Sequence, residues 1–212
     1  MFNTLKYREI QQILKKNNEN CQIVAVSKNH PKESVVEAIN NGVLHFGENR
    51  VLEAKEKFSD LKVEYPKIKL HLTGPLQSNK VKIAVSLFDI FHTLDREKIA
   101  IEFSKYNDKL FDKKIFIQVN TGKEKNKSGI FPNEFPAFKD FCVNDIGLNI
   151  VGLMCIPPID DDPKVHFKIL QELSINSNLK HLSIGMSSDY NIALKYNPTY
   201  IRIGTLLFGN RI

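Results

Sequence analysis

The chain has 212 residues, of which 42% are hydrophobic and 25% charged, so it has the composition of an ordinary globular domain rather than of a disordered or membrane-spanning protein. Its formal net charge is +6, from 30 basic and 24 acidic residues, but these are interleaved and no helix-turn-helix, RNP or zinc-finger pattern appears, so we expect no nucleic-acid partner and no membrane association. The three cysteines, Cys21, Cys142 and Cys155, form no CxxC pair, which favours reduced thiols in a cytoplasmic protein over disulfides or a zinc site.

The order of the predicted elements is the main indication of the fold. Apolar, β-branched runs alternate with segments of helical period, after a first helical pattern at 5–17. The eight predicted strands lie at 22–28, 43–49, 68–74, 89–95, 114–122, 150–158, 181–187 and 200–209. The intervening helices are clear at 31–42, 51–58, 99–110 and 165–173, and less clear at 77–88, 133–145 and 189–198. In the helix at 165–173, Val165, Ile169 and Leu173 share a face that we expect to be buried.

Eight strands alternating with helices favour a single (β/α)8 TIM barrel over an open doubly wound sheet. A dinucleotide-binding fold should show GxGxxG after an early strand, and the sequence has none. We expect residues 1–212 to form one α/β barrel domain. The chain leaves little room for a helix after strand eight, so we expect the N-terminal helix to cover the seam between strands eight and one.

Small and hydroxyl-bearing residues follow the last two predicted strands, where barrels usually bind phosphate. Ser187 and Ser188 precede a predicted helix, whose free N–H groups and dipole would favour an anion. Gly204 permits a close backbone approach, and Thr205 adds a hydroxyl donor. A helix N-cap at either serine, or a core glycine, would explain each segment by itself, but the combination favours a phosphate site.

Lys28 ends the first predicted strand, which neighbours the eighth once the barrel closes. A lysine amine beside a phosphate site suits a ligand with a phosphate at one end and an aldehyde at the other. Pyridoxal 5′-phosphate (PLP) is such a molecule, and its aldehyde would form a Schiff base with Lys28. The simpler alternative is a solvated lysine where the strand leaves the core.

Arg202 lies two residues before Gly204, so both are predicted to face the barrel interior. An inward arginine needs a partner, and a pyridine nitrogen would accept a hydrogen bond from it. A guanidinium there would keep that nitrogen unprotonated and weaken the ring as an electron sink. The alternative partner is a strand carboxylate such as Glu48 or Asp95.

The motifs, taken together, resemble the YggS/PROSC family of PLP-binding proteins, the PLP homeostasis proteins, over nearly the whole chain. Many segments match in a fixed order, which makes the resemblance highly specific. The matching segments read VAVSKNHP, HFGENRVLEAKEK, HLTGPLQSNK, HTLDR, VNTGKEKNKSGI, GLMCIPP, LSIGMSSD and YIRIGTLLFGNR.

The resemblance implies a barrel like the N-terminal domain of alanine racemase, with PLP as cofactor. It also implies that Asn49 lies close to the ring and Arg202 near the ring nitrogen. The residues expected to contact PLP are Lys28, Asn49, Ser187, Ser188, Arg202, Gly204 and Thr205. The sequence departs from the family at Asn197-Pro198, where a turn containing glycine is usual, so the shape of the seventh crossover is open.

Three functions fit the sequence, one carrier and two kinds of enzyme. The first is a PLP carrier or buffer with little or no catalysis, which acts in PLP homeostasis, is monomeric and passes PLP to PLP-dependent apoenzymes. The second is a fold-type-III enzyme, a racemase or decarboxylase. A racemase needs a second base, which alanine racemases take from an added β-domain, and a decarboxylase usually has an acid at the ring nitrogen, so the carrier is favoured. A third option is a class I aldolase, which would carry no chromophore.

The remaining polar residues have simpler explanations. The six histidines show no metal-binding spacing, so we expect buried strand histidines satisfied by backbone groups rather than ligands. The segment KEKNKSG after strand five reads as a solvated loop, with the further hypothesis that Lys125 or Lys127 transiently accepts PLP during transfer.

Overall fold

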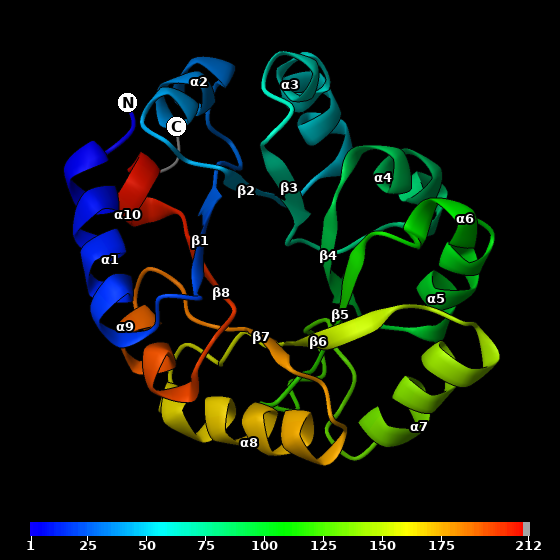
Figure 1. Cartoon of the computed structure of the whole chain (residues 1–212). Coiled ribbons are helices and arrows are strands. Elements are labelled where there is room, and N and C mark those ends of the chain that lie inside the picture. The colour runs from blue at the N-terminus through cyan, green and yellow to red at the C-terminus, as the bar shows by residue number, and fades with distance from the viewer. Residues whose placement is uncertain (210–212) are drawn as a thin grey trace.

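Eight parallel strands close into a barrel in the computed structural model, which describes residues 1–209 (Figure 1). The strands are β1 (Gln22–Val26), β2 (His45–Glu48), β3 (Lys69–Leu72), β4 (Ile90–Leu94), β5 (Lys114–Gln118), β6 (Ile150–Met154), β7 (His181–Ser183) and β8 (Tyr200–Ile203). They follow one another around the barrel in chain order, and β8 pairs with β1 to close it. The predicted (β/α)8 barrel is therefore confirmed.

The helices form a ring outside the barrel (Figure 1). They are α1 (Thr4–Asn17), α2 (Lys32–Asn40), α3 (Val51–Glu64), α4 (Val81–Leu87), α5 (Glu97–Ser104), α6 (Asn107–Leu110), α7 (Phe135–Asp140), α8 (Pro163–Asn176), α9 (Tyr190–Ala193) and α10 (Thr205–Phe208). Short 3-10 turns at Ser78–Lys80 and Leu194–Tyr196 and a π-helical turn at Phe141–Asp145 adjoin α4, α9 and α7. The three crossovers that read poorly from sequence are those with the shortest or most irregular helices.

The helix α1 covers the seam between β8 and β1, as the sequence predicted (Figure 1). Its inward residues Tyr7, Ile10 and Leu14 are buried. The backbone N–H of Asn3 donates to the carbonyl of Leu207 at 2.7 Å, and the Asn18 amide donates to the carbonyl of Pro198 at 2.9 Å. These contacts hold both ends of α1 against the last segment of the chain.

Two details of the predicted elements are wrong. The strand predicted at 200–209 ends at Ile203, and Thr205–Phe208 instead form α10, a single turn in which the N–H groups of Leu207 and Phe208 donate to the carbonyl of Gly204. In α8 the buried residues are His166, Phe167, Leu170 and Ser174, whereas Val165 is 55% exposed. The apolar residues of α8 lie on more than one face of the helix. The face that packs against the core is the one that carries Phe167 and Leu170, so Val165 is turned toward solvent.

The seventh crossover, which the sequence left open, turns at Asn197. This residue has φ 52°, a left-handed conformation that asparagine tolerates better than most residues with a side chain. The turn therefore forms without a glycine and delivers the chain directly into β8.

The core has two parts. The larger lies between the barrel wall and the helices and includes Phe46, Phe58 and Phe91. The smaller fills the barrel itself and contains Val24, Ile90, Phe116, Met154 and Tyr200. The inner layer therefore holds two aromatic rings, where barrel interiors are usually filled by branched aliphatic side chains.

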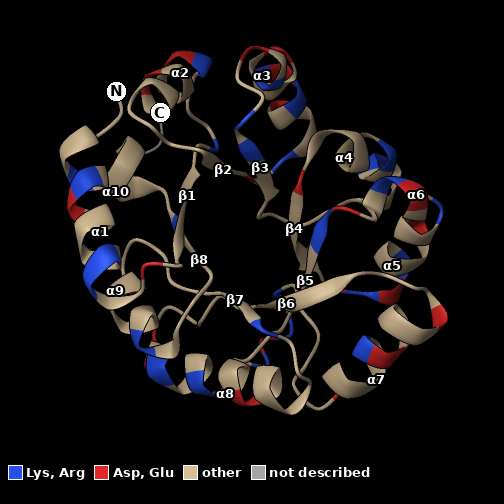
Figure 2. Cartoon of the chain, viewed as in Figure 1, with Lys and Arg blue, Asp and Glu red and all other residues tan. Residues whose placement is uncertain are grey.

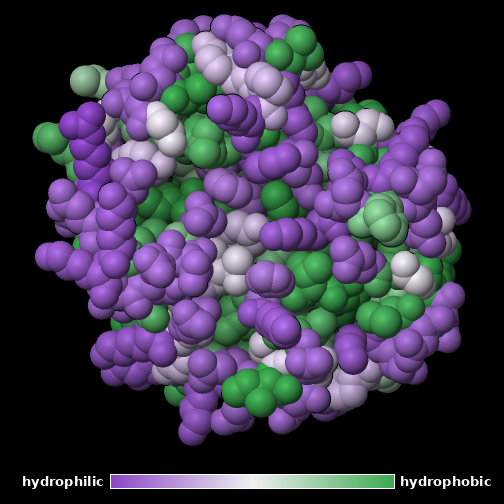
Figure 3. All heavy atoms as spheres, in the orientation of Figure 1, coloured by the Kyte–Doolittle hydropathy of each residue, from purple (hydrophilic) through white to green (hydrophobic). Residues whose placement is uncertain are grey.

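Acidic and basic residues are interspersed around the ring of helices (Figure 2). The face seen in Figure 3 is covered mostly by hydrophilic residues. Among residues 1–209, no helix is long and apolar enough to cross a bilayer.

The seam helix yields a stability test. Ile10 is fully buried against the barrel, and Leu5 on the same helix is 81% exposed. Replacing Ile10 by Ala should lower the free energy of unfolding by about 2–5 kcal/mol, because it removes buried methylene groups and leaves a cavity. Urea denaturation measures the change. The matched control Leu5→Ala should stay within about 0.5 kcal/mol of the parent, and equal effects of both changes would show that α1 does not pack on the seam.

Candidate functional site

A cavity of about 530 Å³ opens at the carboxyl ends of β1, β2 and β8 and the loop after β7. All seven residues predicted to form the site line it. They are Lys28, Asn49, Ser187, Ser188, Arg202, Gly204 and Thr205. The lining is completed by Val26, Thr73, Ile156, Ile159, Met186 and Gly209. Residues from both ends of the chain thus meet at one place, because β8 pairs with β1.

Lys28 lies in the turn that follows β1, and this turn is fixed on both sides of it. The hydroxyl of Ser27 donates to Glu48 Oε1 at 2.7 Å. The backbone N–H of Asn29 donates to Glu53 Oε1 at 2.6 Å, and Asn29 has a left-handed φ of 59°. The two neighbours of Lys28 are therefore anchored to β2 and to α3, which restricts where its amine can reach.

A buried lysine on α3 completes this anchor, and the sequence analysis missed it. Lys57 Nζ donates to Glu48 Oε1 at 2.8 Å, to Glu53 Oε1 at 3.1 Å and to the carbonyl of Ser27 at 2.8 Å. Glu48 is fully buried and its Oε2 has no hydrogen-bond partner in the described structure. Burial raises the pKa of the Glu48 carboxyl, although the Lys57 ammonium opposes the shift. The i, i+4 spacing of Glu53 and Lys57 was a partial signal.

Arg202 is only 4% exposed, and its guanidinium is held by carbonyl groups rather than by a carboxylate. Its Nη1 donates to the carbonyl and to the hydroxyl of Ser183, both at 2.7 Å, and its Nη2 donates to the carbonyl of Cys155 at 2.9 Å. Burial lowers the pKa of the guanidinium. All of these acceptors are neutral, so no ion pair in the described structure neutralises the positive charge of Arg202.

The alternative partners weighed for Arg202 were wrong. Glu48 points to the outer side of the barrel, where it pairs with Lys57 at 2.8 Å. Asp95 instead pairs with Arg96, its neighbour in sequence. Strand alternation explains the first result, because Glu48 and Gly47 face opposite sides of the wall and Gly47 lies against the inward side chains of Val24 and Val26.

The loop after β7 presents Ser187 half-buried and Ser188 exposed. Neither serine caps the following helix, because Asp189 takes the N-cap position. Asp189 Oδ1 accepts from the backbone N–H of Met186 at 2.5 Å, which fixes the loop. The N-cap alternative is therefore wrong. The following helix α9 has only four residues, so hydroxyl and backbone donors rather than a long helix dipole are what the loop offers.

Gly204 does not owe its identity to packing within the chain. A Cβ atom built on it would come no closer than 3.5 Å to another atom, the carbonyl oxygen of Val26, which is an ordinary contact. Its backbone angles are φ −110° and ψ −80°. Gly204 lines the cavity beside the exposed Thr205, so the alternative of a core glycine is disfavoured.

Asn49 and Thr73 lie side by side at the ends of β2 and β3. The Thr73 hydroxyl lies 3.0 Å from Asn49 Oδ1 and 3.2 Å from the carbonyl of Glu48, two acceptors that share its one proton. A second cavity of about 320 Å³ shares Asn49, Thr73 and Ile156 with the first and is also lined by Lys127. Lys127 pairs with Glu124 at 2.8 Å. A role for Lys125 or Lys127 in transfer remains a prediction.

Most of the histidines satisfy one another or nearby hydroxyls, not backbone groups as expected. His45, His71 and His92 are linked in series, while His166 bonds to the Thr121 hydroxyl and His181 to that of Thr199. His30 stacks on Phe208, with ring centroids 5.3 Å apart. Over residues 1–209, no group of three or more His, Cys, Asp or Glu side chains could hold a metal ion.

The three cysteines are free and buried. Burial raises the pKa of each thiol to about 12, so none is a nucleophile at neutral pH.

The chain is similar to known proteins over nearly its whole length. A model of the family described as "Alanine racemase, N-terminal domain" matches residues 5–211. The pyridoxal phosphate homeostasis protein of Vibrio cholerae is 36% identical over 219 residues, which cover 98% of this chain and 93% of that protein. The structure of PipY from Synechococcus elongatus without PLP has a TM-score of 0.86 at 34% identity, covering 97% of this chain and 99% of PipY. The structure of PipY with PLP bound has a TM-score of 0.83 at 32% identity, covering 96% and 100%.

The anchor around Lys57 can be tested by removing its charge. Lys57→Met should lower the free energy of unfolding by about 3–5 kcal/mol, because it leaves the buried Glu48 carboxylate without its counter-charge. Urea denaturation of purified variants measures this. Lys55→Met, an exposed lysine on the same helix, should change stability by less than about 0.5 kcal/mol. Adding Glu48→Gln to Lys57→Met should recover much of the loss, and a double variant as unstable as Lys57→Met would contradict the assignment.

Proposed function

Because the chain belongs to the alanine racemase N-terminal domain family, in which it is closely similar to pyridoxal phosphate homeostasis proteins, we propose that it binds PLP and acts in PLP homeostasis. The observation that carries this proposal is the single cavity that joins an amine at the end of β1 to hydroxyl and backbone groups after β7 and β8. A ligand with an aldehyde and a phosphate at opposite ends matches those two chemistries. The match of the family model to residues 5–211 supports treating 1–212 as one PLP-binding domain.

Each side chain has a distinct role in this proposal. Lys28 is the residue that would hold the cofactor, because its amine can form a Schiff base with an aldehyde, with the aldehyde oxygen released as water. Ser187, Ser188, Gly204 and Thr205 would hold the phosphate, since they are small or hydroxyl-bearing residues that line the cavity. When bound, the group supplies a conjugated ring that can withdraw electrons from an attached amine.

Arg202 and Asn49 would face the ring. Arginine can only donate hydrogen bonds, so Arg202 would leave the ring nitrogen as an acceptor. The carbonyls of Ser183 and Cys155 fix its guanidinium in the ligand-free chain, so little ordering is needed on binding. Asn49, which lies beside Thr73, would reach the ring from the end of β2.

The composition of the cavity favours a carrier over an enzyme. Among the described residues that line it there is no Asp, Glu, His, Tyr or Cys. Racemisation needs a second acid–base group opposite the lysine, and a decarboxylase usually places an acid at the ring nitrogen. Neither is present among these lining residues. We therefore propose a protein that holds and releases PLP with little or no turnover, and the alternative is a fold-type-III racemase or decarboxylase that completes its site from elsewhere.

The state of the cysteines bears on where the protein acts. Three buried free thiols fit a reducing compartment such as the cytoplasm. PLP-dependent apoenzymes are the proposed recipients of the cofactor, and we propose that the chain acts as a monomer. The second cavity shares Asn49, Thr73 and Ile156 with the first and is lined by Lys127, and we propose it as the route by which PLP leaves.

The attachment point is tested by absorbance. Protein incubated with PLP should show a visible absorption band from the Schiff base, and Lys28→Ala should abolish it. After borohydride reduction, mass spectrometry should find the phosphopyridoxyl group on the peptide that contains Lys28. The control Lys32→Ala, on the neighbouring helix, should keep the band. An unchanged band in Lys28→Ala would remove the central assignment, and a colourless wild type would favour the aldolase.

The absence of turnover is tested with amino acids. PLP-loaded protein incubated with L-alanine, L-lysine or L-ornithine should give neither the D-enantiomer nor the decarboxylated amine above the rate of free PLP, because the cavity offers no second acid–base group. Chiral chromatography and mass spectrometry measure both products. Formation of either product that disappears in Lys28→Ala would establish the enzyme alternative.

A further inference from the structure

A line of three histidines crosses the interior of the barrel. His45 Nδ1 lies 2.9 Å from His71 Nε2, and His71 Nδ1 lies 2.8 Å from His92 Nε2. The three residues come from the neighbouring strands β2, β3 and β4. The residue facing His71 on β2 is Gly47, and the residue facing it on β4 is Ile90. His71 and His92 each lie two residues beyond the residue that pairs with the preceding histidine, so the line advances along the strands.

The line continues to the cavity at the carboxyl ends of the strands. His92 Nδ1 lies 2.7 Å from the Ser183 hydroxyl on β7. The same hydroxyl lies 2.7 Å from Arg202 Nη1 on β8, and Arg202 lines the proposed PLP cavity. An unbroken series of hydrogen bonds therefore joins His45 to Arg202.

The direction of every hydrogen bond in the line follows from its last member. A guanidinium can only donate, so the Ser183 oxygen accepts from Arg202, and His92 Nδ1 is the one acceptor that the described structure offers to the proton of this buried hydroxyl. His92 then carries its proton on Nε2 and donates to His71 Nδ1. By the same step, His71 carries its proton on Nε2 and donates to His45 Nδ1. All three rings share one tautomer, in which Nδ1 accepts and Nε2 carries the proton.

The surroundings keep these rings uncharged. Burial lowers the pKa of His45 to about 4 and lowers those of His71 and His92 well below the usual value, and the cations Lys69, Lys114 and Arg202 act in the same direction. Asp89 is the one acid that opposes the shift at His45.

Aromatic packing holds the rings in place. The Tyr200 ring contacts all three, with centroid distances of 5.0 Å to His71, 5.5 Å to His92 and 6.0 Å to His45. Phe116 stacks on His92 at 4.9 Å with an interplanar angle of 2°. Each ring therefore has little freedom to rotate away from its hydrogen-bond partner.

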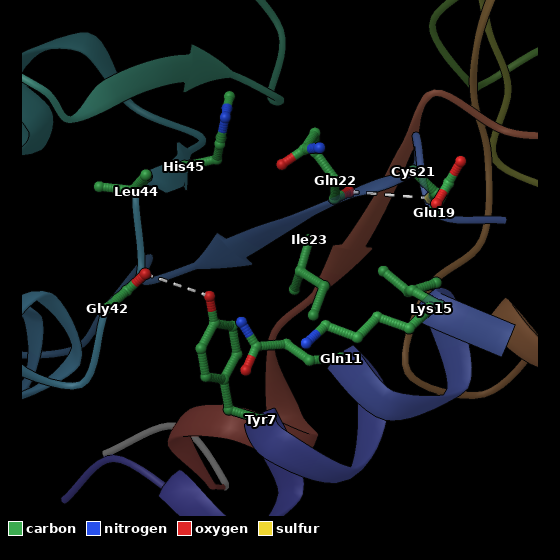
Figure 4. Close-up of a pocket in the computed structure, with 11 residues that line it drawn as sticks. Tyr7, Gln11, Lys15, Glu19, Cys21, Gln22, Ile23, Gly42, Leu44 and His45 are labelled. Atoms are coloured by element: carbon green, nitrogen blue, oxygen red, sulfur yellow. Dashed lines mark hydrogen bonds between the residues drawn. The ribbon is translucent and has the colours of Figure 1, made fainter.

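The far end of the line lies at the opposite mouth of the barrel. His45 begins β2, is half-buried and borders a separate cavity of about 220 Å³ formed with α1 and β1 (Figure 4). In Figure 4 its ring points away from Tyr7 and Gln11 of α1. The first residues of neighbouring strands, Gln22 of β1 and Lys69 of β3, are exposed nearby, so this end is accessible to solvent.

We propose that Ser183 and the three histidines are positioning residues for Arg202, fixing the direction in which its guanidinium donates and connecting the PLP cavity to the opposite mouth of the barrel. This inference rests on the proposed role of Arg202 at the PLP ring. The chain of tautomers itself exists without the ligand. A proton added at His45 Nδ1 would face the Nε2–H of His71 and break the hydrogen bond between the two rings. A charge on His45 at one mouth of the barrel would therefore disturb the hydrogen bonds that lead to Arg202 at the other mouth.

Nitrogen NMR of the ligand-free, ¹⁵N-labelled protein tests the direction of the line. At neutral pH, the imidazoles of His45, His71 and His92 should all be neutral, with the proton on Nε2 and an accepting Nδ1. A proton on Nδ1 of any of the three, or a charged ring, would overturn the proposal. This measurement does not depend on whether PLP binds.

The link to the ligand is tested with Ser183→Ala, which removes one hydroxyl and little volume. The His92 Nδ1 resonance should move, because it loses its donor, and the Kd for PLP should rise about tenfold, since one interaction that orders the charged Arg202 is lost. Ser174→Ala is the matched control, a buried serine whose hydroxyl bonds to the carbonyl of Leu179 away from this line. Ser183→Thr, which keeps the hydroxyl, should bind PLP more tightly than Ser183→Ala.

The outcomes separate the two proposals. A folded Ser183→Ala variant with wild-type PLP affinity would overturn the positioning role. Failure of the wild type to bind PLP would overturn the proposed function, and the tautomers would then still decide whether the polarised line exists.

Discussion

The pairing of β8 with β1 is the constraint on which the rest of this structure depends. Residues from Gln22 to Ala25 pair with residues from Tyr200 to Ile203. That register brings the turn that carries Lys28 beside Gly204 and Thr205, which come from the other end of the sequence. The helix α1 packs over this seam, so the contacts that stabilise the fold there also assemble the cavity.

Two buried cations flank this cavity, and the chain satisfies them in different ways. Lys57 lies outside the barrel wall and is neutralised by carboxylates, which makes it a fixed anchor for the turn at Lys28. Arg202 lies inside the wall and is held by carbonyl and hydroxyl oxygens that leave its charge unneutralised. The first arrangement stabilises a loop, whereas the second keeps a positive field in the cavity, which suits an anionic ligand.

The sequence predicted the fold well, and the residues that it pointed to as a site all line one cavity, because strand order and strand ends are visible in local patterns. The alternation of strands and helices is visible in hydrophobic period, and the order of a barrel then dictates which strand ends meet. The partners of buried polar groups were less predictable. Arg202 was predicted to face the barrel interior, but the sequence does not say which side of the wall the short strand β2 turns Glu48 toward, so a pairing of Arg202 with Glu48 stayed open. The bonds among His45, His71 and His92 depend on a register between strands that only the folded chain defines.

The seam also has a mechanical consequence. A ligand bonded to Lys28 and held at Gly204 and Thr205 would bridge the first and last strands of the barrel. Its hydrogen bonds to Gly204 and Thr205 would exist only while the barrel is closed, so bound ligand would stabilise the folded chain by mass action. Binding and release of the ligand would therefore change how readily β1 and β8 separate. The rate at which this seam opens would depend on whether the cofactor is bound.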